Sequence, residues 1–394
     1  MSARRITWLV LACALVGVSG CISTPPEKAV TGTVSPALGV LGEMDAPELA
    51  YTEWRLADNA MLQDYGERFA ALFDNNFDGI GGMRIRLLDM ETGTHRVVVP
   101  DAIGRAHGFT MTGLHCSDEW VIWEELRGDE MNDPLNVEWR LWAAPIDAAG
   151  TAVGRPVLIR KAVVSNRSRP LFQANGHTVY VMSNTFPNAK QEGAIYRSSI
   201  VAIDLETRVE HEIYTSERML HAFSVMGDEL TVAEYVDYET KRARICVLGL
   251  DDGIERFVYE PDGPGLSHWP VFWKDTLLWS RDDGSNDPWP SLWCLVNDGT
   301  AFKLAEDGLD PVAAGPYVFY REYPDTRSAT ITGLELATMR TFELLRTGVG
   351  LERYWQPMIN GKQDAHMLVV WRQVFAADVG AERGGTYVRR YNVP

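Results

Sequence analysis

Short apolar runs recur along this chain from residue 50 onward, and each is long enough to form the buried part of a β-strand. The third residues of successive runs lie 41 to 71 positions apart. Several runs lead directly into charged or hydroxyl side chains, which indicates that a strand ends and a loop begins there. The seven runs are Ala50-Tyr51-Thr52, Val121-Ile122-Trp123, Val179-Tyr180-Val181, Leu230-Thr231-Val232, Leu277-Leu278-Trp279, Val318-Phe319-Tyr320 and Val369-Val370-Trp371.

Further strands are predicted on both sides of these runs. After most runs comes an alternating stretch that ends in a turn signal such as Asp-Gly, which tolerates the positive φ angles of a tight hairpin. Before several runs comes a strand with a proline near its start, where the missing N–H need not break a ladder bond. The turn-ending stretches are 87–93, 145–150, 202–207, 248–253, 295–299 and, in a weaker form, 334–338, and the prolines are Pro170, Pro270, Pro311 and Pro357.

A repeat of about 40 to 50 residues with four strands is typical of a β-propeller blade. We therefore predict an all-β propeller with seven blades; a six-bladed ring with one decorated hairpin is the alternative. Helical spacing of apolar residues near residues 59–73 predicts a short helical insertion in the first blade. The last blade lacks a fourth strand, and we expect a segment within residues 29–51 to supply it and close the ring.

The repeat resembles the TolB-type, or WD40-like, propeller repeat. The resemblance is clearest from Pro270 to Leu304, where PVFWKDTLLWSRDDG is followed by SLWCLVNDGTAFKL. It spans roughly residues 100–392 and is less regular from 45 to 100. It implies the fold but hardly the activity, because propellers carry unrelated functions.

The N-terminus is typical of a bacterial lipoprotein signal peptide. Two arginines precede the apolar run from Ile6 to Gly20, and Val18-Ser19-Gly20-Cys21 resembles the lipobox, in which cleavage comes directly before an acylated cysteine. An ordinary signal peptide or an uncleaved anchor is the alternative. We predict a signal peptide over 1–21, lipidation at Cys21, a tether over 22–44 and the propeller over 45–394, held outside the cytoplasm on the cell membrane.

The charge of the chain limits the classes of partner, and its cysteine content limits the possible disulfides. Two of the 37 basic residues leave with the signal, so 35 remain against 54 acidic residues, a net charge of about −19. Such an acidic chain is unsuited to nucleic acid, which needs a basic surface. The three remaining cysteines form no disulfide framework, and only Cys246 and Cys294, on equivalent strands of neighbouring repeats, are candidates for a pair.

One loop has part of a calcium-binding pattern. Asp74, Asn76 and Asp78 alternate before Gly79, as in the first half of such a loop, but the twelfth position is Ile85 instead of a bidentate glutamate. A polar turn explains the same residues, so no cofactor is expected and Ca²⁺ is a minor hypothesis.

A second candidate site follows from the repeat itself. The residues before each innermost-strand proline, or its aligned counterpart, should meet at one mouth of the central channel, with His268 beside them. Such a mixed polar and aromatic lining is typical of binding sites, although solvated structural residues would look the same. The predicted ring consists of His107, Arg169, His221, Trp269, Asp310 and Gln356.

The sequence favours binding over catalysis. It contains no Gly-x-Ser-x-Gly elbow, no His-Glu-x-x-His and no phosphate-binding glycine loop. We predict a membrane-tethered binding or scaffolding propeller for an envelope protein, peptide or glycan. The alternative is a propeller lyase or hydrolase that acts on a polysaccharide or peptide in the channel, because metal sites and triads are defined by geometry.

Overall fold

The computed structural model describes most of the chain beyond residue 41. The described residues are 42–56, 60–74, 83–128, 136–164, 167–185, 197–237, 241–261, 265–282, 290–295, 301–325, 328–347, 358–363, 366–373 and 385–394. The predicted signal peptide, Cys21 and most of the tether therefore lie outside them.

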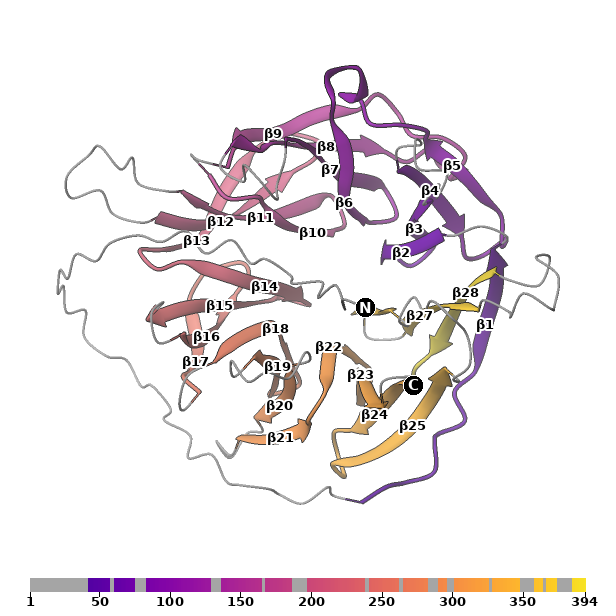
Figure 1. The fold of residues 1–394 in the computed structure, drawn as a ribbon, viewed down its shortest axis with the longest axis vertical. Coiled ribbons are helices and arrows are strands. Elements are labelled where there is room, and N and C mark those ends of the chain that lie inside the picture. The colour runs from indigo at the N-terminus through magenta and orange to yellow at the C-terminus, as the bar shows by residue number, and fades with distance from the viewer. Residues whose placement is uncertain are drawn as a thin grey trace, which may run out of the picture.

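The described strands form seven four-stranded antiparallel sheets arranged around a common centre (Figure 1). This confirms the all-β propeller, and the number of sheets is that of the predicted blades. Six blades take their strands in chain order, innermost strand first. Blades 1 to 3 comprise β2 (Ala60–Tyr65), β3 (Phe69–Asp74), β4 (Arg84–Asp89) and β5 (His95–Val99); β6 (Thr110–Cys116), β7 (Trp120–Arg127), β8 (Glu138–Pro145) and β9 (Val157–Val163); and β10 (Leu171–Asn175), β11 (Thr178–Thr185), β12 (Arg197–Asp204) and β13 (Glu210–Ser216). Blades 4 to 6 comprise β14 (Leu220–Met226), β15 (Glu229–Asp237), β16 (Arg242–Gly249) and β17 (Glu255–Tyr259); β18 (Leu266–Trp273), β19 (Thr276–Asp282), β20 (Ser291–Leu295) and β21 (Ala301–Ala305); and β22 (Gly308–Ala314), β23 (Tyr317–Asp325), β24 (Ser328–Glu335) and β25 (Arg340–Thr347).

The seventh blade joins the two ends of the described chain. Its inner strands β26 (Met358–Gln363), β27 (His366–Gln373) and β28 (Gly385–Asn392) come from the C-terminal end, and its outermost strand β1 (Tyr51–Leu56) comes from the N-terminal end. β1 pairs antiparallel with β28 from Tyr51↔Tyr391 to Leu56↔Thr386. An N-terminal strand thus closes the ring as predicted, but it begins where the predicted range of 29–51 ends.

The predicted helical insertion near residues 59–73 is wrong, because this region forms β2 and β3. All five residues from Phe69 to Phe73 are buried, since β3 packs against neighbouring blades on both faces. A short apolar run of this kind fits a buried helix as well as a buried strand. The second strand of blade 1 is therefore β3, and not the run Ala50-Tyr51-Thr52.

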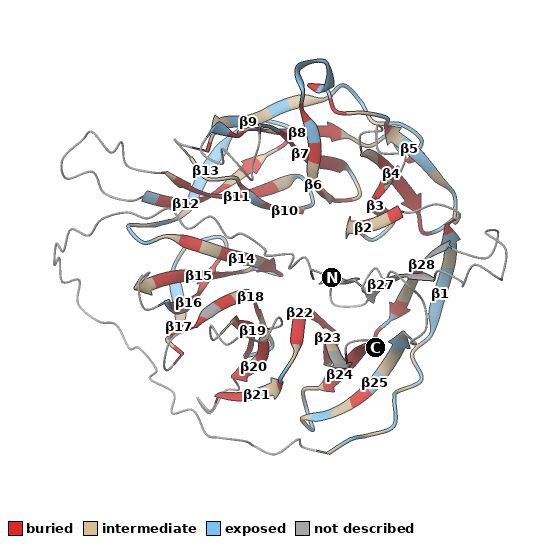
Figure 2. Ribbon diagram, viewed as in Figure 1, coloured by how far each residue is buried: buried red, intermediate tan, exposed pale blue. Residues whose placement is uncertain are grey.

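The hydrophobic core is divided into seven clusters, and each lies between two adjacent blades. The cluster between blades 1 and 7, for example, joins Leu62 and Leu72 to Val388, so apolar packing continues across the closure. Buried positions fill the blades, whereas exposed positions gather on outer strands such as β9 and β13 (Figure 2). Burial of apolar surface between blades therefore holds the ring together.

The three described cysteines are free and buried. Cys246 lies between blades 3 and 4 and Cys294 between blades 5 and 6, so the suggested disulfide is not formed. Burial raises the pKa of Cys246 to about 12, which keeps its thiol protonated and unreactive. Within the described part of the chain, no helix has the length and apolar character to cross a membrane.

Candidate functional site

The ring has two faces that differ in their connections. At the hairpin face, tight turns join the first strand of each blade to the second, as between β2 and β3. At the crossover face, the chain passes from one blade to the next, as between β5 and β6. The described members of the predicted ring all lie in these crossovers or in the first four residues of an innermost strand. Gln356 lies outside the described residues.

Two innermost strands carry the same irregularity at a residue before proline. The pairing of β18 with β19 shifts between His268 and Val271, and that of β22 with β23 shifts between Leu309 and Val312. The residues inside these bulges, Trp269 and Asp310, have φ angles of 45° and 52°. A left-handed backbone is costly for a residue with a side chain, and such residues gather at sites where the surrounding structure fixes them for a purpose.

The two bulges present different side chains. Trp269 is 48% exposed, which is unusual for a tryptophan in an innermost strand. Asp310 lies 2.5 Å from Arg321 Nη2 of the adjacent strand. Burial raises the pKa of Asp310, and the arginine opposes this shift. Trp269 therefore offers a free apolar surface, whereas Asp310 is engaged within its own blade.

Trp269 belongs to an aromatic group that spans blades 4 and 5. Its ring centroid lies 5.5 Å from that of His268, and the His268 centroid lies 5.1 Å from that of His221 on β14. His221 also contacts Tyr235 of β15, at 5.1 Å. Three residues that the repeat predicts to be neighbours are thus joined by ring contacts; we call His221, His268 and Trp269 the imidazole–indole cluster.

His221 is chemically unusual. Both of its ring nitrogens are shielded from solvent and have no hydrogen-bond partner among the described residues. Burial and the neighbouring His268 lower the pKa of His221 to about 3, and the backbone of Ser267 opposes this shift. The contact between His221 and Ser267 does not have hydrogen-bond geometry. Burial also lowers the pKa of His268. Both rings are therefore neutral at pH 7, and His221 carries an unsatisfied donor and an unsatisfied acceptor.

The other predicted ring residues are placed differently. Arg169 forms an ion pair with the buried Glu124 of β7, at 2.7 Å, so it is held against blade 2. His107 ends the 3-10 helix η1 (Arg105–His107) in the crossover before β6 and is exposed. Neither residue has a ring contact with the imidazole–indole cluster among those described.

The crossover face also contains buried carboxylates that the sequence did not predict, on residues that follow the apolar runs. Glu125 accepts hydrogen bonds from the backbone N–H groups of Ile103 and Gly104, at 2.5 and 3.0 Å. The buried Glu234 of β15 accepts from Ser216, the last residue of β13, and from Arg218 in the crossover between blades 3 and 4, at 2.7 and 3.0 Å. The second strands continue past the runs and bury these carboxylates, whereas the sequence suggested a loop. Their regular position, two residues after Trp123 and Val232, is the signal that identifies them.

The calcium hypothesis remains a prediction. Asp74 ends β3, and Asn76 and Asp78 lie outside the described residues. No group of three or more His, Cys, Asp or Glu side chains in the described ranges is arranged to hold a metal ion.

Comparison with solved structures supports the fold. A structure from an analysis of two prolyl endopeptidases matches at 13% identity over 80% of this chain and 46% of its own, with a TM-score of 0.54. Acylaminoacyl peptidase from Pyrococcus horikoshii matches at 10% identity over 86% and 52%, with a TM-score of 0.50. The β-propeller domain of the Trilobed protease from Pyrococcus furiosus matches at 11% identity over 82% and 92%, with a TM-score of 0.50.

These similarities show that the chain is a β-propeller protein. They indicate no specific function, because sequence identities this low support the fold alone. The chain spans about half the length of the two peptidases. No protein-family description and no curated protein sequence matches it.

Proposed function

We propose that this protein is an extracytoplasmic binding or scaffolding module, tethered to the cell membrane by a lipid on Cys21, which engages an envelope protein, peptide or glycan through its crossover face. The apolar leader that ends in Val18-Ser19-Gly20-Cys21 supports the address. The acidic charge of the chain supports a neutral or basic partner rather than nucleic acid.

The imidazole–indole cluster is the observation that carries the proposal. Trp269 supplies exposed apolar surface at a fixed backbone position, and exposed tryptophans are frequent anchors of binding interfaces. His268 lies against it with a neutral ring that can donate one hydrogen bond and accept another. Behind it, His221 keeps two unsatisfied nitrogens, a cost that folded proteins usually avoid unless the site has a use. A ligand that combines an apolar face with hydroxyl or amide groups suits this combination.

Crosslinking capture from intact cells tests the proposal. The full tagged chain with Cys21 and its Trp269→Ala variant are expressed side by side, and the captured material is analysed for protein and for glycan. Loss of an interface anchor costs at least about 2 kcal/mol, so capture should fall by about thirtyfold. Val209→Ala, which removes another exposed apolar side chain from a hairpin-face turn, should leave capture unchanged. Equal capture by wild type and Trp269→Ala would place binding elsewhere on the ring.

A further inference from the structure

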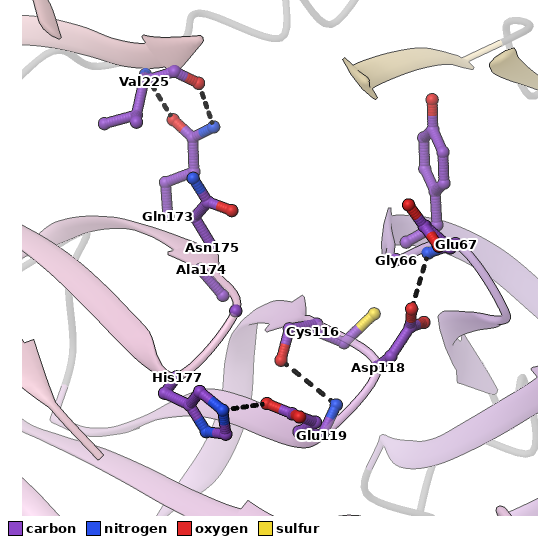
Figure 3. Close-up of a pocket in the computed structure, with 13 residues that line it drawn as sticks. Gly66, Glu67, Cys116, Asp118, Glu119, Gln173, Ala174, Asn175, His177 and Val225 are labelled. Carbon is purple, nitrogen blue, oxygen red and sulfur yellow. Dashed lines mark hydrogen bonds and ion pairs between the residues drawn. The ribbon is translucent and has the colours of Figure 1, made fainter. Parts of the chain in front are cut away.

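A separate pocket opens at the hairpin face, at the other end of the innermost strands. Its volume is about 340 Å³, within the range of small-molecule sites. The lining residues come from the first hairpin of each of blades 1, 2 and 3, with Val225 of blade 4. In Figure 3 these residues surround one open space, and the amide of Asn175 points into it. The pocket lies outside the imidazole–indole cluster and shares no residue with it.

The wall between blades 1 and 2 is built around Asp118. Its carboxylate accepts hydrogen bonds from the backbone N–H groups of Glu67, Arg68 and Phe69, at 3.0, 2.8 and 3.1 Å. This close approach requires a glycine at position 66, because a Cβ there would lie 2.3 Å from Asp118 Oδ1. The turn of blade 1 is therefore fixed to the turn of blade 2 before any ligand arrives.

The other walls are fixed in the same way. The Gln173 side chain donates to the carbonyl of Val225 and accepts from its N–H, both at 2.9 Å, which ties blade 3 to blade 4. His177 Nε2 lies 2.9 Å from Glu119 Oε2, which ties blade 3 to blade 2. A pocket with walls held by such bonds is preorganised, so little ordering cost opposes binding.

The pocket combines an apolar floor with an acidic rim. Tyr65, Cys116, Ala174 and Val225 are buried and form the floor. Glu67, Asp118 and Glu119 bring three carboxylates, and no lysine or arginine is among the described lining residues.

Two nearby arginines reduce this negative charge only in part. Arg68 is directed toward Asp89, at 2.8 Å. Arg390 donates to the main-chain carbonyl of Glu67, at 3.0 Å. One further buried carboxylate, Asp64, lies directly before Tyr65, and its Oδ2 is hydrogen-bonded to His115 Nδ1, at 2.9 Å. The rim therefore keeps negative charge that a cation can meet.

We propose that this pocket binds an alkylammonium group, the protonated amine of a lysine side chain or of a free diamine. The cavity gives the position of the site. Its negative charge favours a cation, and its apolar floor favours a methylene chain. The methylene chain packs on the floor, and the ammonium group donates hydrogen bonds to Glu67 and Glu119 at the rim. Because a carboxylate at the rim is partly solvated, each contributes modestly and the attraction falls with salt.

Calorimetric titration of the full chain in detergent tests this assignment. The probes are 1,4-diaminobutane, a lysine-containing tripeptide and the same tripeptide with norleucine, which keeps the methylenes and lacks the charge. We expect both amines to bind, the norleucine peptide to bind at least about tenfold more weakly, and binding to weaken as salt rises from about 0.05 to 0.5 M. Binding of the diamine alone would indicate a small polyamine as the ligand, and binding of the peptide alone a protein lysine.

Variants distinguish amine binding in the pocket from nonspecific attraction of amines to the acidic surface. Glu67→Gln together with Glu119→Gln should weaken amine binding by about tenfold, and Asn175→Trp should block the mouth without removing a charge. Glu212→Gln, which removes a carboxylate from β13 outside the pocket, is the matched control. The proposal is overturned if neither amine binds at millimolar concentration, if norleucine binds as well as lysine, or if the control weakens binding as much as the rim variants. Failure here leaves the function proposed for the crossover face untouched, since Trp269 is absent from this pocket.

Discussion

At the scale of single residues, this protein keeps several side chains in states that stability alone does not explain. His221 has two buried nitrogens without partners, and Trp269 has a left-handed backbone and an exposed indole. An unsatisfied buried polar group costs about 1 to 3 kcal/mol, and strained backbone adds a similar amount. Both costs fall on the same small region between blades 4 and 5, which is the strongest reason to regard this region as functional.

Replacement of His221 should separate stability from binding. His221→Phe keeps the ring and removes the two unsatisfied nitrogens, so the free energy of unfolding at pH 7 should stay the same or rise by about 1 kcal/mol, while capture of the ligand falls.

The pH dependence gives a second readout of His221. In the unfolded chain this imidazole binds a proton below a pKa of about 6.5, whereas in the folded chain its pKa is about 3. Between these values the unfolded state binds more protons, so wild type loses stability as pH falls, by up to about 1.4 kcal/mol per unit. Urea unfolding at pH 7 and pH 5 should show a smaller loss in His221→Phe. An identical loss in both proteins would mean that His221 titrates normally when folded.

At the scale of elements, the closure of the ring depends on one strand pair with its own side-chain clasp. Arg389 of β28 pairs with Glu53 of β1, at 2.6 Å, and lies 4.0 Å from the ring centre of Tyr51. The segment before β1 adds to this closure, since Met44 and Leu49 pack against the cluster between blades 6 and 7. β1 therefore has local support as well as its backbone ladder.

Arg389→Ala should loosen this closure specifically. Loss of the ion pair and of the cation–π contact, both partly exposed, should cost about 1 kcal/mol and speed amide hydrogen exchange in β1. Arg197→Ala removes a comparable exposed pair with Glu212, at 3.1 Å, inside blade 3, and should leave exchange in β1 unchanged. Equal exchange in β1 for all three proteins would show that the ladder alone holds the closure.

The elements also show what the sequence could and could not predict. The alternation of apolar runs and Asp-Gly turns predicted the blades from 2 onward, because each run is a strand buried between two neighbours. Blade 1 was misread, since Phe69 to Phe73 is apolar on both faces and period alone does not distinguish a buried helix from a buried strand. The site was predicted in part: the repeat brought His221, His268 and Trp269 together, but partners such as Glu124 for Arg169 depend on tertiary packing that no spacing reveals.

At the scale of the whole molecule, a closed ring offers two separate faces on one rigid body. The crossover face presents the imidazole–indole cluster, and the hairpin face presents the acidic pocket between blades 1, 2 and 3. In the proposed arrangement, the leader and Cys21 hold this body at the membrane.

Site-specific photo-crosslinking in intact cells shows whether the crossover face engages a ligand. A photoreactive amino acid is placed at position 269 in one version of the full chain and at position 209, in a hairpin-face turn, in another. We expect a discrete crosslinked product from position 269 and none of the same size from position 209. The same product from both positions, or a product from position 209 alone, would contradict it.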